Sequence, residues 1–104
     1  MPKAKRIYTV ESSMGELRAT TYDKQEAEKF CLYLNEYDVL MQEVGGWGEP
    51  RFKHYVVLQR KAYRGETVGL TPLQKADMER YYENGYRAQD GTYYIIKGGE
   101  IQKK

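Results

Sequence analysis

The chain has 104 residues, of which 40% are hydrophobic and 31% are charged, with a formal net charge of +2. This length predicts one small domain rather than two. No run approaches the ~18 consecutive apolar residues of a membrane-spanning helix, and no apolar segment follows the basic first residues, so we expect neither a membrane contact nor a secretory signal. A lone cysteine, Cys31, excludes an intrachain disulfide, which favours a reducing, cytoplasmic setting with no metal and no cofactor.

Tyrosine dominates the aromatic composition, with 11 tyrosines against two phenylalanines and one tryptophan. A tyrosine ring buries a large area, but its hydroxyl needs a hydrogen-bond partner. We therefore expect a folded domain whose core is partly tyrosine. Tyrosine is also enriched in recognition surfaces, and composition alone does not separate the two uses.

Charge is unevenly distributed along the chain. Residues 7–50 carry nine acidic residues against three basic ones, whereas residues 51–64 carry five basic residues and no acidic one. Such asymmetry indicates electrostatic recognition of a partner. It is equally consistent with a basic strand that lies against the protein's own acidic helix.

The first half of the chain begins with two alternating segments, 7–12 and 17–22, which predict a β-hairpin with its turn at 13–16. Asp23 as N-cap, with Glu26 three residues later, predicts the start of a helix. Four apolar residues at helical spacing extend that helix to about three turns: Ala27, Phe30, Cys31 and Leu34. Leu32 lies opposite this stripe, where Tyr33 and Tyr37 would extend it into a small apolar patch.

The second half continues with predicted strands at 38–44 and 52–63, separated by a glycine-rich loop at 45–50. Thr71, Pro72 and Gln74 have the pattern of a second helix start, and that helix would end near Glu83, before Asn84 and Gly85. A strand at 92–96 and a turn at 98–99 follow.

These elements predict an α+β fold of order ββα-ββ-α-β(β). It would be a single small domain with a mainly antiparallel sheet of about four to six strands and two helices on one face. We expect a basic N-terminal arm at 1–6, the domain at 7–97, and a short basic C-terminal tail at 98–104.

The sequence shows no glycine-rich phosphate-binding motif and no His-Glu-x-x-His motif. Cys31 lies within the apolar stripe, so we expect it to be buried and inert. The only histidine, His54, has no partner implied by spacing, although a small ligand-binding domain or enzyme that uses it is one alternative. We therefore expect no catalytic residues.

A protein-binding module is the main interpretation of the sequence. Trp47, in the glycine-rich loop, is either an aromatic anchor for a partner or a ring folded over the sheet edge. Leu73, Met78, Tyr81 and Tyr82 span about half of the second helix, which suggests contact with the sheet and with a partner, including a second copy of the chain.

The module would be a small adaptor or inhibitor that blocks an acidic surface of its partner, of the type found in phages and other mobile elements by analogy alone. The expected partner-binding residues are Trp47, Arg51, Tyr63, Arg64, Met78 and Tyr82.

The alternative is a nucleic-acid-binding domain that uses the strand at 52–63. Phe52, His54, Val56 and Leu58 would share one face of this strand. The other face interleaves basic residues with tyrosines, which is typical of a platform for single-stranded nucleic acid: Lys53, Tyr55, Lys61 and Tyr63. In the other interpretation of this strand, a helix covers Tyr55 and Val57, and Lys53 and Lys61 are exposed to water.

Overall fold

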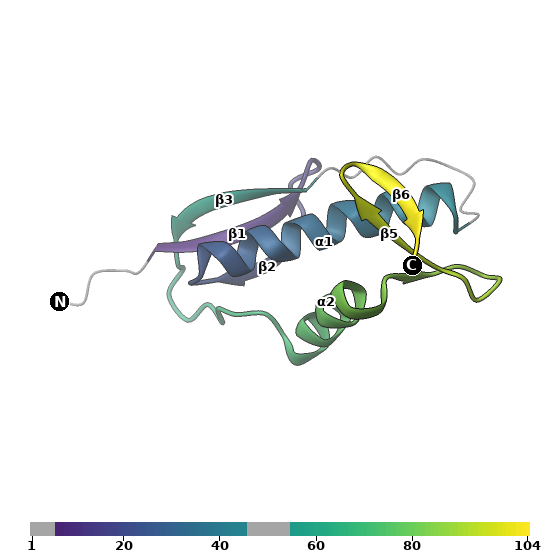
Figure 1. The fold of residues 1–104 in the computed structure, drawn as a ribbon. Coiled ribbons are helices and arrows are strands. Elements are labelled where there is room, and N and C mark those ends of the chain that lie inside the picture. The colour runs from purple at the N-terminus through teal and green to yellow at the C-terminus, as the bar shows by residue number, and fades with distance from the viewer. Residues whose placement is uncertain (1–5, 46–54) are drawn as a thin grey trace.

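A computed structural model describes residues 6–45 and 55–104 of the chain. The elements in chain order are β1 (Arg6–Ser12), β2 (Leu17–Thr21), α1 (Lys24–Glu43), β3 (Tyr55–Lys61), α2 (Pro72–Asn84), β4 (Tyr86–Arg87), β5 (Tyr93–Lys97) and β6 (Glu100–Lys103). In this part of the chain they form two three-stranded antiparallel sheets, β2-β1-β3 and β4-β5-β6, with two helices (Figure 1). The predicted small α+β fold is confirmed.

The first sheet has β1 at its centre, between the two strands that it pairs with. Its register places Val10 opposite both Ala19 of β2 and Val57 of β3. These three side chains share the face that packs on α1, where Val10 is completely buried. The predicted hairpin of β1 and β2 is confirmed.

Helix α1 begins where the sequence predicts, because the side chain of Asp23 accepts hydrogen bonds from the backbone N–H groups of Gln25 and Glu26. The helix does not stop after three turns. It runs for 20 residues to Glu43, a length of about 30 Å.

The strand predicted at 38–44 is therefore wrong, because residues 38–43 belong to α1. The apolar stripe continues at helical spacing because Tyr33 and Tyr37 pack on the core. Tyr33 and Leu40 are buried, and Tyr37, Met41 and Val44 are half-buried against the same core.

The second sheet packs on the C-terminal half of α1 (Figure 1). Tyr94 and Ile96 of β5 and Ile101 of β6 supply its contacts with the core. Residues 98–104, expected as a basic tail, instead include β6, which pairs with β5 across a turn formed by Gly98 and Gly99. The two-residue β4 was not predicted.

Helix α2 begins with the predicted capping box. Gln74 N–H donates to the hydroxyl of Thr71, and Thr71 N–H donates to the side-chain oxygen of Gln74. The helix ends at Asn84, and Gly85 follows with a φ of 86°. Among the helices described here, none is long and apolar enough to cross a membrane.

The segment between β3 and α2 crosses the face of the first sheet that points away from α1. Ile7 lies on this face, yet it is completely buried. Arg60, which is opposite Ile7 on β3, binds Glu66, and the hydroxyl of Thr20 on β2 donates to the carbonyl of Thr67. The segment thus connects the two outer strands on the face of the sheet where Ile7 lies.

Candidate binding pocket beside the two helices

Tyrosine rings fill the junction between the two helices and β4. Tyr33 of α1 lies 5.4 Å from Tyr81 of α2, measured between ring centroids. Tyr37, one turn further along α1, lies 6.3 Å from Tyr81 and 5.0 Å from Tyr86 of β4. Tilted and edge-on rings at these distances attract one another beyond their area of burial. The tyrosine-rich core expected from composition is therefore present at the helix interface.

The hydroxyls of the two neighbouring tyrosines of α2 have partners. Tyr81 donates to the carboxylate of Glu36 over 2.7 Å, and Tyr82 donates to the backbone carbonyl of Lys29 over 2.7 Å. Burial raises the pKa of Tyr33 and of Tyr82 to about 12. Burial, followed by the hydrogen bond to Glu36, also raises the pKa of Tyr81. These rings are therefore neutral, structural groups at physiological pH.

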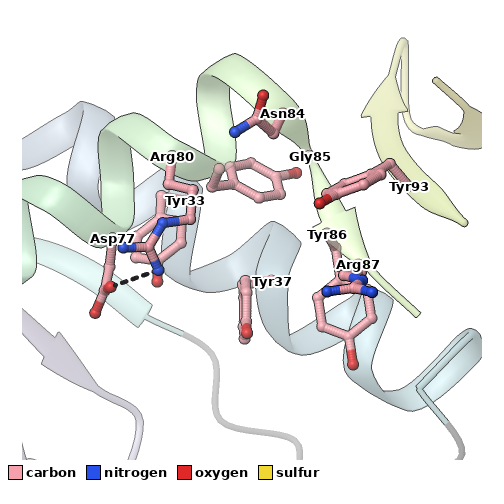
Figure 2. A pocket seen from close by; sticks show the side chains of 10 residues that line it. Tyr33, Tyr37, Asp77, Arg80, Asn84, Gly85, Tyr86, Arg87 and Tyr93 are labelled. Carbon is pink, nitrogen blue, oxygen red and sulfur yellow. Dashed lines mark ion pairs between the residues drawn. The ribbon is translucent and has the colours of Figure 1, made fainter. Parts of the chain in front are cut away.

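A pocket of about 570 Å³ opens beside this cluster, and we call it the tyrosine pocket. Its volume is within the range of about 300–1,000 Å³ that is typical of ligand sites. Figure 2 shows Arg80 and Tyr33 on one side and Arg87 and Tyr86 on the other, with Tyr37 between them. Its lining residues come from α1, α2, β4 and β5: Tyr33, Tyr37, Asp77, Arg80, Tyr81, Asn84, Gly85, Tyr86, Arg87 and Tyr93.

The uncompensated charge of the tyrosine pocket is positive. The Nη1 atom of Arg80 lies 3.5 Å from the Oδ1 atom of Asp77, one helical turn away, so these two charges offset each other. Arg87 is exposed, and its side chain has no ion-pair or hydrogen-bond partner within residues 6–45 and 55–104. Apolar ring walls beside a free guanidinium suit a group that is both flat and anionic.

Of the residues predicted to bind a partner, some lie outside the described residues, one is buried and others are exposed. Trp47 and Arg51 lie outside the described residues, as do Lys53 and His54 of the two alternatives. Met78 is only 6% exposed and belongs to the core, so its predicted role in partner contact is corrected.

Two more of the predicted partner-binding residues, Tyr63 and Arg64, are exposed. Tyr82 is half-buried on α2, with its ring 5.1 Å from the amine of Lys29.

A nucleic-acid platform along the whole of β3 would need the face with Tyr55 to be exposed. In the structure, the beginning of β3 exposes the other face. Tyr55 is 6% exposed and lies against α1, where Asn35 exchanges two hydrogen bonds with its backbone. Val56 and Leu58 are exposed instead. The role predicted for Tyr55 is therefore wrong, whereas Lys61, which is exposed, and Tyr63 keep theirs as predictions.

Other sequence expectations meet mixed outcomes. Cys31 is buried, as expected, and burial raises the pKa of its thiol, which keeps it unreactive. Leu32 is exposed, as expected, but Tyr33 turns inward and does not extend its patch. Leu73 is 70% exposed, so the broad apolar face predicted for α2 is narrower.

The pocket residues that the sequence did not indicate are Arg80, Tyr86, Arg87 and Tyr93. The available signal was a pair of arginine–tyrosine neighbours, at 80–81 and 86–87, around the end of α2. Within the described ranges, no three His, Cys, Asp or Glu side chains meet in a way that could hold a metal ion. Comparison with protein-family models, curated proteins and solved structures finds no match to this chain.

Proposed function

We propose that this chain is a non-enzymatic protein-binding module, an adaptor or inhibitor, which accepts an acidic segment of its partner in the tyrosine pocket. The observation that supports the proposal is the composition of that pocket. Tyrosine rings make up half of its lining residues, and the guanidinium of Arg87 has no ion-pair partner among the residues that the structure describes. Tyrosine and arginine are the residue types that most often carry the energy of protein interfaces.

The construction of the pocket supports recognition rather than chemistry. Tyr33, Tyr37 and Tyr81 are fixed by ring contacts between two helices, so little side-chain freedom is lost when a partner binds. At the rim, Tyr93 is 39% exposed and the side chain of Arg80 is 68% exposed. A partner residue that enters the pocket would therefore meet a preformed wall and an exposed rim.

The proposed mechanism is steric. The module would cover a surface of its partner, and Arg87 would favour a partner with an acidic patch. A carboxylate beside an aromatic or aliphatic side chain would satisfy both parts of the pocket. An assembly of two copies of this chain is a separate outcome, which light scattering of the purified protein detects.

The test is capture of partners from source-cell lysate, with nuclease added, by wild-type protein and two pocket variants, Arg87→Glu and Tyr93→Ala. Both residues lie at the rim, so we expect the variants to fold. The matched controls change the same residue types at the other end of the molecule, in Arg64→Glu and Tyr63→Ala.

We expect a partner that survives nuclease and binds each pocket variant at least about 10-fold more weakly, as is typical of a central interface residue. The controls should retain wild-type binding. A partner that binds both pocket variants as tightly as wild type would contradict the proposal. So would a partner that is lost only with the Arg64 or Tyr63 control.

A further inference from the structure

Tyr63 is the most exposed tyrosine described, with 68% of its surface accessible. It lies just beyond β3, at the end of the first sheet where β1 begins, far from β5 and β6 (Figure 1). The guanidinium of Arg60 lies 4.1 Å from the centroid of its ring, which is a cation–π contact. We propose that this end of the sheet binds single-stranded nucleic acid by stacking a base on the Tyr63 ring.

The ring is held in place although it contributes little to the core. Arg60 makes two hydrogen bonds to the carboxylate of Glu66, of 2.8 and 2.6 Å. The same carboxylate accepts the backbone N–H of Tyr63 over 2.9 Å, and Glu66 N–H donates to the carbonyl of Tyr63. Arg60 and Glu66 thus fix both the backbone and the ring of Tyr63. A ring that is already positioned loses little freedom when a base stacks on it.

Three further basic residues lie at this end of the first sheet. Arg6 is opposite Lys61 in the pairing of β1 with β3, and Arg64 follows Tyr63 directly. All three are exposed, and none has an ion-pair partner within the described parts of the chain. The nearby carboxylate of Glu66 is already taken by Arg60. Phosphates are therefore attracted to the place where the ring offers a stacking surface.

An unpaired base is favoured over a duplex because a base inside a duplex already stacks on its neighbours. An acidic protein segment would engage the three basic side chains, whereas each nucleotide of a single strand supplies both a phosphate and a flat base that can stack on the exposed ring. This site shares no residue with the tyrosine pocket, so the two proposals fail or succeed separately.

The test is fluorescence anisotropy of the full chain with a labelled thymidine oligomer of about 12 nucleotides. Tyr63→Ala removes the stacking ring, and Tyr63→Phe keeps it. Met14→Ala is the control, since it removes a side chain that is 73% exposed from the turn between β1 and β2, at the opposite end of the first sheet. Circular dichroism establishes that each variant is folded.

We expect Tyr63→Ala to weaken binding about 5-fold or more, and Tyr63→Phe and Met14→Ala to stay within about 2-fold of wild type. Neutralising Lys61 or Arg64 should lower the slope of log affinity against log salt by about 0.7 each. Three outcomes would overturn the proposal: no binding at low salt, equal binding by Tyr63→Ala and wild type, or duplex binding as tight as single-strand binding. Equal affinity for a polyglutamate chain would also overturn it, since the surface would then attract polyanions without stacking.

Discussion

The hydroxyl of Tyr81 provides a sharp test of how the helix junction is stabilised. The side chain is 4% exposed and donates a hydrogen bond of 2.7 Å to the carboxylate of Glu36. Tyr81→Phe removes that hydroxyl and leaves the ring, so the contacts with the rings of Tyr33 and Tyr37 remain. The change in stability therefore reports on the hydroxyl and its hydrogen bonds rather than on the ring, and the Glu36 variant below isolates the bond to the carboxylate.

The expected loss is larger than that for a neutral hydrogen bond because the acceptor is ionised. Hydrogen bonds to charged groups contribute about 1.5–3 kcal/mol, against about 0.5–1.5 kcal/mol for neutral pairs. For a domain of this size, each kcal/mol lowers the melting temperature by about 4–8 °C. We expect Tyr81→Phe to lower the melting temperature by about 6 °C or more.

The assays are thermal unfolding, which gives the melting temperature, and urea unfolding, which gives the free energy of unfolding, both followed by circular dichroism. Tyr82→Phe is the matched control on the adjacent residue, where the hydroxyl donates to the neutral backbone carbonyl of Lys29. In a Glu36→Gln background, the loss caused by Tyr81→Phe should shrink toward that of a neutral pair. Two results together would contradict this reasoning. Tyr81→Phe would lower the free energy of unfolding no more than Tyr82→Phe does, and the loss would be the same in the Glu36→Gln background. The charge-assisted hydrogen bond would then not be what stabilises the junction.

Three further predictions concern pH and backbone conformation. The hydrogen bonds from Arg60 and from a backbone N–H hold the pKa of Glu66 at about 2, below its ordinary value of 4.5. The stability that this carboxylate contributes should therefore be fully present above pH 4.5 and be lost as pH falls toward 2. Glu66→Gln should flatten that part of the curve of unfolding free energy against pH. The pKa of about 12 for Tyr33 and Tyr82 predicts that stability declines as pH rises from 10 through 12, with tyrosinate absorbance and helical signal changing together. Gly85→Ala should destabilise the fold by more than the about 1–3 kcal/mol typical of backbone strain, since φ is 86° and the added carbon would also lie 2.6 Å from a carbonyl oxygen of β5. Gly91 has the same φ but open space around it, so Gly91→Ala is the control for backbone strain alone. Urea unfolding measures both losses.

Local chemistry explains which elements the sequence predicts well. Asp23 and Thr71 bind backbone N–H groups two or three residues away, so each helix start is readable from neighbouring residues. The C-terminal half of α1 is different, because Tyr33 and Tyr37 are compatible with either a wet surface or a core. Only packing against Tyr81 and Tyr86 decides that these tyrosines are buried. Strand β6 likewise depends on Ile101 reaching a helix far away in the sequence.

The tyrosine pocket could not be predicted from spacing, since its walls come from segments separated by some 40 residues or more of chain. Its existence follows from the length of α1. A three-turn helix would have ended near Leu34, before Tyr37, and would have left Tyr86 and the second sheet without a helix to pack on. Because α1 continues to Glu43, it supports the first sheet along one part and the second sheet along the other. The Tyr63 ring and the tyrosine pocket thereby lie at different ends of the molecule, on parts of the fold that pack on the same helix. A ligand at either site should therefore leave the affinity of the other unchanged, and a measured coupling between them would show that α1 does not act as a rigid support.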